Sequence, residues 1–424
     1  MGPMKIFYGW RVVAAACGIQ FLLAALMVQS FGLYVAVLAE DMGWSKTALA
    51  GGAALQSAET ALLGPMLGWL LDRFGPRRMI RTGMVCLGAG LWLLSQVQSL
   101  PVFYASAVLM SVGASLSGYF PLSIAVVHWF EKQRARALSM MTVGLAVGGL
   151  MSPLLAWSMQ HLGWRETAMV AGTLAWLVGL PLAGLIRHRP AELGLHPDGI
   201  DPTPRPPQAD GSAPTSTLVE EAHHFTLVQA LRTPAFWLLA AGHALALLVV
   251  SAVTVHAVTH MKEGLGHSMT AAGGFMMLLT LGQLGGVLLG AAMPQHLDKR
   301  KIAAACMLSH TLGLLCLTYA SHVAMMWAFA LLHGVAWGLR GPYMQAIRAD
   351  YFGTRWLGRI MGISTVLLAF GQMGGPLIAG MLADWQGDYR LGFSTLALLA
   401  ALGSVAFWMA RPPTRPKAAH KPAN

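Results

Sequence analysis

The chain has 424 residues, of which 56% are hydrophobic and only 11% are charged. Soluble domains carry about 25% charged residues, so this composition excludes a soluble enzyme, a nucleic-acid-binding protein and a disordered scaffold. The net charge of +11 at pH 7 does not require a nucleic-acid partner, because membrane proteins concentrate Lys and Arg in their cytoplasmic loops. The composition therefore predicts an integral membrane protein in contact with lipids.

Apolar stretches that are long enough to cross a bilayer recur along the whole chain. A hydrocarbon core about 30 Å thick needs about 20 apolar residues in a helix. Six such stretches precede a Pro-rich segment and six follow it, at residues 10–38, 45–71, 78–97, 101–129, 136–160, 165–187, 233–260, 268–293, 302–320, 322–347, 358–383 and 389–410. We therefore expect an all-α membrane protein with a six-helix bundle over 1–190, a cytoplasmic Pro-rich linker over 191–230 and a second bundle with a short cytoplasmic tail over 231–424.

The Lys and Arg residues predict the orientation of these spans, because basic loops stay on the cytoplasmic side. With the N-terminus inside, cytoplasmic segments hold 23 of the 28 Lys and Arg residues, and outer segments hold 4. The one that is left, Arg340, falls within a predicted span. We therefore expect both termini to be cytoplasmic.

The two halves of the chain contain similar sequences. The stretch RALSMMTVGLAVGGLMSPLLA starts at position 136 and matches RIMGISTVLLAFGQMGGPLIA, which starts at position 359, so that Gly148 pairs with Gly371 at an offset of 223. A weaker match at an offset of 221 pairs Tyr119 with Arg340. Two similar bundles related by an axis along the membrane normal are typical of secondary transporters, whose solute site lies between the bundles near the midplane.

The loop after the second predicted span has the sequence GWLLDRFGPRR and resembles the signature loop of the major facilitator superfamily. That family keeps the loop between helices two and three, so the resemblance implies twelve spans in the major facilitator fold. In the family, the Asp and Arg of this loop latch the two bundles on the cytoplasmic side. The alternative is that the basic residues serve topology alone. The gating residues that the resemblance implies are Gly68, Asp72, Arg73, Gly75, Arg77 and Arg78.

Three further segments resemble the bacterial monocarboxylate and oxalate–formate branch of the superfamily. They are YGWRVV from position 8, HWF from position 128 and PAELGLHPDG from position 190. That branch holds its carboxylate with a cationic side chain in helix eight, where this chain offers only Gln283. The resemblance implies a monocarboxylate-like anion as solute and a bacterial inner membrane as location. Since the cationic side chain of helix eight is missing, the chain can share the scaffold of this branch and bind a different ligand.

Two charged residues, Glu59 and Arg340, lie at membrane depth, away from the ends of the predicted spans. A charge at a helix centre costs about 2.5–3.5 kcal/mol on insertion scales, so each residue needs a partner or a wet cavity. A guanidinium matches a carboxylate in geometry, so we expect Arg340 to hold a small organic anion opposite Tyr119, while Glu59 or His243 carries a proton. The structural alternatives are a carboxylate bonded to Gln56 and an Arg that reaches to the cytoplasmic surface.

Several other polar side chains in the spans are candidates for the solute pathway. His333, Trp337 and Arg340 recur at helical spacing, so they should share one face of their helix. The substrate-binding residues that we expect are Arg340, Tyr119, His333, Trp337, Gln20, Ser115 and Gln283. His256 and His260 have the spacing of metal ligands, but no third ligand follows them, so we expect no metal site.

The sequence as a whole predicts a monomeric secondary transporter that moves a small organic anion with protons by alternating access. No Gly-Lys-Ser or Gly-Lys-Thr phosphate loop occurs, so we expect no cofactor and no drive by ATP. One alternative is proton-driven efflux of lipophilic or cationic compounds, with Glu59 as the counter-charge and Arg340 in a structural role. A second alternative is a nutrient sensor that binds its ligand without transporting it. The solute, the direction of transport and the choice between symport and antiport stay open.

Overall fold

The computed structural model describes residues 7–28, 30–44, 46–200 and 224–414. All the regular elements in these four ranges are helical. The greater part of the linker predicted over 191–230 lies outside the described residues. So do five of the basic residues that were counted for topology, which are Lys5, Arg205, Arg415, Lys417 and Lys421.

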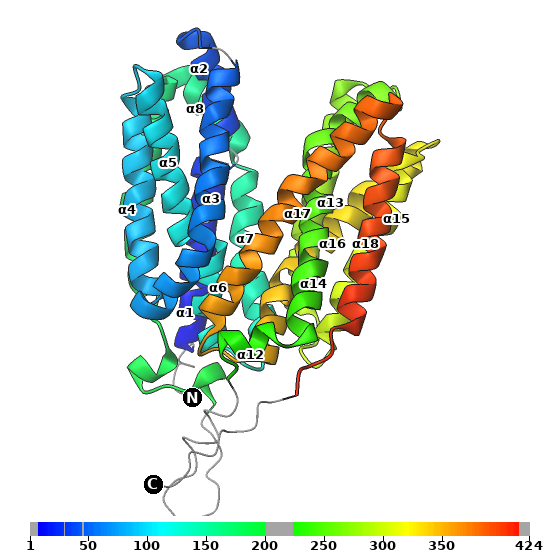
Figure 1. The fold of residues 1–424 in the computed structure, drawn as a ribbon. Coiled ribbons are helices and arrows are strands. Elements are labelled where there is room, and N and C mark those ends of the chain that lie inside the picture. Colours follow the sequence, from blue (N-terminus) through cyan, green and yellow to red (C-terminus); the bar gives the residue numbers. More distant parts are fainter. Residues whose placement is uncertain (1–6, 29, 45, 201–223, 415–424) are drawn as a thin grey trace, which may run out of the picture. The chain divides into compact units, whose positions relative to one another are not determined.

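The chain forms two compact units, and the first comprises Met1–Asp198 together with Thr280–Gln295. Its helices in chain order are α1 (Tyr8–Leu23), η1 (Ala24–Val28), α2 (Phe31–Asp41), α3 (Lys46–Phe74), α4 (Pro76–Ser95), α5 (Leu100–Ser117), α6 (Tyr119–Trp129), α7 (Arg134–Gly149), α8 (Ser152–Leu162), α9 (Trp164–Leu174), η2 (Ala175–Gly179), α10 (Leu180–Leu185) and η3 (Pro190–Leu193). Within this unit α4 packs along α5, and α7 packs along α1 (Figure 1).

The second unit comprises Gly199–Leu279 and His296–Asn424. Its helices are α12 (Leu227–Leu231), α13 (Pro234–Thr259), η5 (His260–Gly264), the first part of α14 (Met269–Ala292), α15 (Lys299–Thr318), α16 (Val323–Phe352), α17 (Leu357–Gln386) and α18 (Arg390–Met409). α17 packs along α13, while α15 packs along both α16 and α18 (Figure 1). The remainder of α14 belongs to the first unit.

The described helices account for the spans that the sequence predicts. Within the described ranges, nine helices or helix runs are long and apolar enough to cross a membrane, and α7 with α8 adds a tenth that is bent by 41°. α3 and α4, of 29 and 20 residues, carry the charged residues of the loop between them and complete the set of twelve. The fold class predicted from the apolar stretches is therefore confirmed.

One predicted span, 101–129, is broken rather than continuous. α5 ends at Ser117 and α6 starts at Tyr119, because Gly118 adopts extended angles of φ −80° and ψ −160°. The segment matched to it in the second half, α16, runs unbroken through Pro342. Tyr119 therefore occupies the first turn of a helix, whereas Arg340 lies in the interior of one.

Glycines allow two helices of the first unit to approach closely. A Cβ atom on Gly144 of α7 would lie 1.9 Å from the carbonyl oxygen of Cys17 on α1, and one on Gly148 would lie 2.5 Å from that of Phe21. Real Cβ atoms do not come this close to a carbonyl oxygen. Only glycine is compatible with the observed packing of α7 on α1.

The second unit repeats this arrangement between α17 and α13. A Cβ atom on Gly371 would lie 2.2 Å from the oxygen of Ala244, and one on Gly375 would lie 1.9 Å from that of Leu248. All four residues follow their counterparts by 227 positions, so Gly371 corresponds to Gly144. The sequence match at an offset of 223, which paired Gly148 with Gly371, relates the starts of α7 and α17 at Arg134 and Leu357. The glycine contacts correspond four residues further along, because glycines spaced by four residues align at both offsets.

Candidate functional site

Among the described arginines of the second unit, Arg340 is the most buried, with an exposed fraction of 1%. Its guanidinium interacts electrostatically with basic side chains from three helices, namely His243 of α13, His310 of α15 and His333 of α16. The same charge acts on Cys306 of α15. The interior of this unit therefore gathers positive and basic groups around one guanidinium.

A second arginine of α16, Arg348, belongs to the same group. It is 3% exposed, and its Nη2 donates to Nδ1 of His243 at 3.2 Å. This contact requires an unprotonated Nδ1, so the imidazole of His243 carries its proton on Nε2. We call Arg340, Arg348, His243, His310 and His333 the base cluster.

Two of its members, His310 and His333, touch each other. Both are fully buried, and their Nδ1 atoms are 3.1 Å apart. His333 also approaches Trp337, with ring centroids 6.5 Å apart and the planes at 74°. The predicted helix face of His333, Trp337 and Arg340 is thus assembled from buried and half-buried side chains.

Two members of the base cluster were missed as site residues by sequence reasoning. Arg348 was counted as a cytoplasmic loop residue, because the span was expected to end at position 347, whereas α16 continues to Phe352. His310 is a single polar residue in an apolar stretch, and a single residue produces no periodic pattern. A signal for Arg348 was available, because it follows Arg340 by eight residues, which is close to two helical turns.

In the first unit, Glu59 of α3 is held by two hydroxyl groups of α5. Its Oε2 accepts hydrogen bonds from Ser111 and, at 3.2 Å, from Ser115. Ser115 was predicted to bind substrate and Glu59 to carry a proton, and the structure places the two in direct contact. The neighbouring Gln56 donates to the carbonyl oxygen of Ala107 at 3.4 Å.

The remaining predicted solute residues also lie in the first unit. Gln20 of α1 is 2% exposed, and its Nε2 has no hydrogen-bond partner within the described ranges. Tyr119 is half-buried, and Gln283 is half-buried in the part of α14 that belongs to this unit. The pairing of Tyr119 with Arg340 across a cavity stays a prediction, since the two residues belong to different units.

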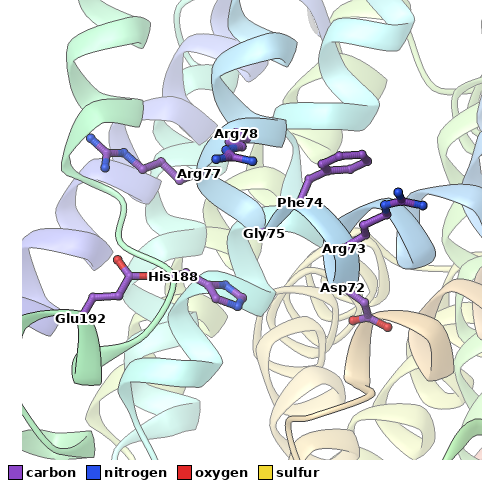
Figure 2. A pocket seen from close by; sticks show the side chains of 8 residues that line it. All are labelled: Asp72, Arg73, Phe74, Gly75, Arg77, Arg78, His188 and Glu192. Atoms are coloured by element: carbon purple, nitrogen blue, oxygen red, sulfur yellow. The ribbon is translucent and has the colours of Figure 1, made fainter.

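The predicted gating loop lines a pocket of about 310 Å³ (Figure 2). Asp72 and Arg73 come from the end of α3, Arg77 and Arg78 from the start of α4, and His188 and Glu192 from the segment after α10. Gly75 turns the chain between the two helices with a φ of +75°, which favours glycine. Gly68 is buried one and a half turns before Arg73.

The pocket holds three arginines and a histidine beside the carboxylates of Asp72 and Glu192, and the charges around it affect one another. Partial burial, followed by the charges of Arg187 and Arg81, lowers the pKa of Arg77 from its ordinary value. Burial, followed by the charge of Arg189, lowers the pKa of His188. Such a loop is suited to contact with an acidic group.

The two histidines with metal-ligand spacing have other partners. Nδ1 of His256 lies 3.1 Å from the hydroxyl of Tyr389, and its Nε2 lies 3.0 Å from the carbonyl oxygen of Pro376. Nε2 of His260 lies 3.2 Å from the oxygen of Leu317. These contacts occupy both nitrogens of His256 with α17 and the residue that precedes α18, so the pair serves to join helices.

Comparisons with known proteins agree with this architecture. Residues 17–321 and 257–424 match the family model described as Major Facilitator Superfamily. The chain is 24% identical over 405 residues to monocarboxylate transporter 13 of Bos taurus, covering 94% of this chain and 88% of the relative. It is 26% identical over 358 residues to the agnestins efflux protein AgnL12 of Paecilomyces divaricatus, covering 81% and 73%.

Among solved structures, the fold is similar to that of the human organic anion transporter MFSD10. The TM-score is 0.69 at 16% identity, with 94% of this chain and 99% of that chain covered. A family match over nearly the whole chain, the twelve helical segments and the loop around Gly75 lead to one assignment. The chain belongs to the Major Facilitator Superfamily, which consists of transporters rather than enzymes.

Proposed function

We propose that this secondary transporter moves a small, monocarboxylate-like organic anion together with protons by alternating access. The observation that carries the proposal is Arg340, which is buried at 1% exposure among the histidines of the base cluster. A charge inside a membrane protein is expensive and is retained mainly where it serves function. The planar fork of a guanidinium matches a carboxylate, which makes an anion the fitting ligand.

The named relatives support an anionic solute without establishing it. One is called a monocarboxylate transporter and one is described as an organic anion transporter. The resemblance to the bacterial monocarboxylate and oxalate–formate branch points to the same solute class and to an inner membrane with both termini cytoplasmic. We propose Tyr119, Gln20, Ser115 and Gln283 as further solute contacts, supplied by the first unit.

Glu59 is the proton carrier that we favour in the first unit. Its carboxylate accepts from Ser111 and Ser115, and protonation replaces one acceptor by a donor, so the two hydroxyl groups must rearrange. That rearrangement would link the protonation of Glu59 to the position of α5 relative to α3. His243 is the second candidate, and it must first leave Arg348 before its Nδ1 binds a proton.

The loop with Asp72, Arg73, Arg77 and Arg78 is proposed as the cytoplasmic latch between bundles 1–190 and 231–424. Three arginines of this loop line its pocket and Gly75 forms its turn, which supports a contact of these arginines with an acidic partner. Closing and releasing this latch would alternate with access from the other side.

The test is uptake of labelled pyruvate into proteoliposomes under an inward proton gradient. We expect Arg340→Gln to lower uptake at least about tenfold, since one charge-assisted bidentate contact contributes 1.4 kcal/mol or more. Arg340→Lys keeps the positive charge but loses the planar guanidinium, so its pyruvate uptake should lie between that of the wild type and that of Arg340→Gln. The matched control is Arg390→Gln, because the side chain of Arg390 is 62% exposed at the start of α18. Uptake that survives Arg340→Gln would refute the anion site.

Efflux of lipophilic or cationic compounds is the second candidate, and the similarity to the agnestins efflux protein AgnL12 supports it. Here Glu59 would be the counter-charge for the solute. Vesicles that export a lipophilic cation in exchange for protons, and that lose this export in Glu59→Gln, would establish efflux instead. Pyruvate should not affect such export.

A further inference from the structure

The paired histidines His310 and His333 form a structure that the proposed anion site does not require. They come from neighbouring helices, α15 and α16, and both are fully buried. Their rings are 4.4 Å apart between centroids at an angle of 64°, and their Nδ1 atoms are 3.1 Å apart. Two imidazoles that meet through the same nitrogen type must share a hydrogen.

The shared hydrogen determines the state of the two outer nitrogens. One ring donates from Nδ1 and therefore has a lone pair on Nε2, whereas the other ring accepts at Nδ1 and carries its hydrogen on Nε2. In the part of the chain that the structure describes, neither His310 Nε2 nor His333 Nε2 has a hydrogen-bond partner. The pair thus offers one basic nitrogen that takes a proton without breaking the Nδ1 contact.

A proton on that nitrogen strengthens the contact between the rings. The donating ring becomes an imidazolium, and hydrogen bonds with an ionised donor are about twice as strong as neutral ones. The second ring accepts this hydrogen bond, so that the positive charge is shared between one ring on α15 and one on α16. The geometry therefore stabilises the protonated state of the pair more than it would stabilise a single histidine.

The titratable groups around the pair come from its own two helices and from the helices packed against them. On α16 itself the charge of Arg340 acts on both rings, and on α15 Cys306 lies one turn from His310. On α13 the histidines are His243, which is bonded to Arg348, and His256, which contacts Tyr389 and Pro376. α18 also packs along α15, and its only titratable side chain is Arg390 at its first position.

We propose that the His310–His333 pair is a proton-binding site whose protonation is linked to the binding of an anion at Arg340. The inference rests on the proposed anion site. Before the anion binds, a protonated pair and the guanidinium of Arg340 repel each other in a medium of low dielectric constant. A bound carboxylate compensates the charge of Arg340 and removes this repulsion, so the anion favours the proton.

Linkage between the two sites is reciprocal. If the anion raises the affinity of the pair for a proton, the proton raises the affinity of Arg340 for the anion by the same factor. One carboxylate and one proton then bind as an electrically neutral couple. In this proposal the proton of the symport binds in the second unit, at a site distinct from Glu59 of the first unit.

The first experiment measures proton uptake when pyruvate binds to the purified wild-type protein in weakly buffered detergent solution at pH 6.5. We expect close to one proton to be taken up per pyruvate bound. Over the pH range in which the pair titrates, the dissociation constant of pyruvate should then fall by up to about tenfold per unit of decreasing pH. Binding without proton uptake would overturn the inference and leave the anion site intact.

The second experiment locates the proton with variants. In His310→Gln and His333→Gln, proton uptake should disappear and the affinity for pyruvate should become independent of pH. His296→Gln is the matched control, because His296 is exposed beyond the end of α14. Equal proton uptake in both glutamine variants and in the wild type would refute the site and direct attention to Glu59.

A measurement on the wild type alone covers the case in which the variants do not fold. In protein labelled with ¹⁵N-histidine, pyruvate should add an imidazolium signal coupled to a second, hydrogen-bonded ring. An unchanged histidine spectrum on binding would refute the inference. If pyruvate and other carboxylates do not bind at any pH, it is the proposed function that fails, and this inference fails with it.

Discussion

The guanidinium of Arg348 donates to Nδ1 of His243 at 3.2 Å, and this bond joins α16 to α13 in the interior of the second unit. Arg348 is 3% exposed, so its charge is removed from solvent. A buried charge with a specific acceptor is destabilised strongly when the acceptor is removed. The contact therefore contributes both to the packing of the two helices and to the position of Arg348.

A double-mutant cycle of His243→Ala and Arg348→Ala should show strong coupling. We expect each single change to lower the free energy of unfolding by about 1–3 kcal/mol, because a hydrogen bond to a charged group is lost. The double variant should lose about 0.5–3 kcal/mol less unfolding free energy than the two single variants lose together. Thermal unfolding in detergent measures all four proteins, and additive effects would contradict the contact.

The burial of Arg348 could not be predicted from the sequence. Hydropathy gives the existence of a span but not its end, and α16 extends to Phe352, beyond the position 347 expected for its last residue. A basic residue near a span end then looks like a loop residue. The burial of Arg348 depends on α13, which is 105 residues away along the chain, and such long-range contacts leave no local pattern.

The features that the sequence predicted correctly are local ones. The twelve helical segments follow from apolar length. His310 and the break at Gly118 were missed, because each depends on one residue in an otherwise continuous apolar stretch. The contact between Glu59 and Ser115 joins two helices and required the structure.

The glycine contacts should be sensitive to a single methyl group. We expect Gly144→Ala and Gly375→Ala each to destabilise the protein by about 1–3 kcal/mol, the usual cost of overpacking, because each Cβ would lie 1.9 Å from a carbonyl oxygen. Thermal unfolding in detergent is the measurement. Gly285→Ala is the control, since no atom of the described residues outside its own helical turn lies within 4 Å of its Cβ position. Equal effects at all three sites would contradict the close packing.

Asp198 fixes the loop between α6 and α7 by accepting three backbone N–H groups. Its carboxylate lies 3.0 Å from the nitrogen of Glu131, 2.7 Å from that of Lys132 and 3.3 Å from that of Gln133. Its φ of +59° is compatible with Asn and Gly but unfavourable for Ala.

We therefore expect Asp198→Ala to lower the free energy of unfolding by about 0.5–2 kcal/mol, as does the loss of a side-chain cap on backbone N–H groups. Asp198→Asn should lower the free energy of unfolding least. Asp198→Gly should lie between the Asn and Ala variants, because glycine accepts the positive φ but has no side-chain acceptor. Glu40→Ala, at an exposed position of α2, is the control. A stability of Asp198→Ala equal to that of the wild type would show that the three contacts are unimportant.

His188 should make the stability of the protein depend on pH. Burial, followed by the charge of Arg189, lowers its pKa in the folded state from the ordinary value of 6.5. Above pH 6.5 the residue is neutral in both states and has no effect. Below 6.5 the unfolded chain binds a proton that the folded chain binds less well, so the free energy of unfolding falls as the pH decreases.

Thermal unfolding at pH 7.5 and pH 5.5 isolates this contribution when the wild type is compared with His188→Gln. The variant should lose less stability between the two values, because its side chain does not titrate while all other groups are shared. His161→Gln is the control, since His161 is exposed on α8, and it should follow the wild type. An equal loss of stability in wild type and His188→Gln would mean that the acid sensitivity arises elsewhere in the chain.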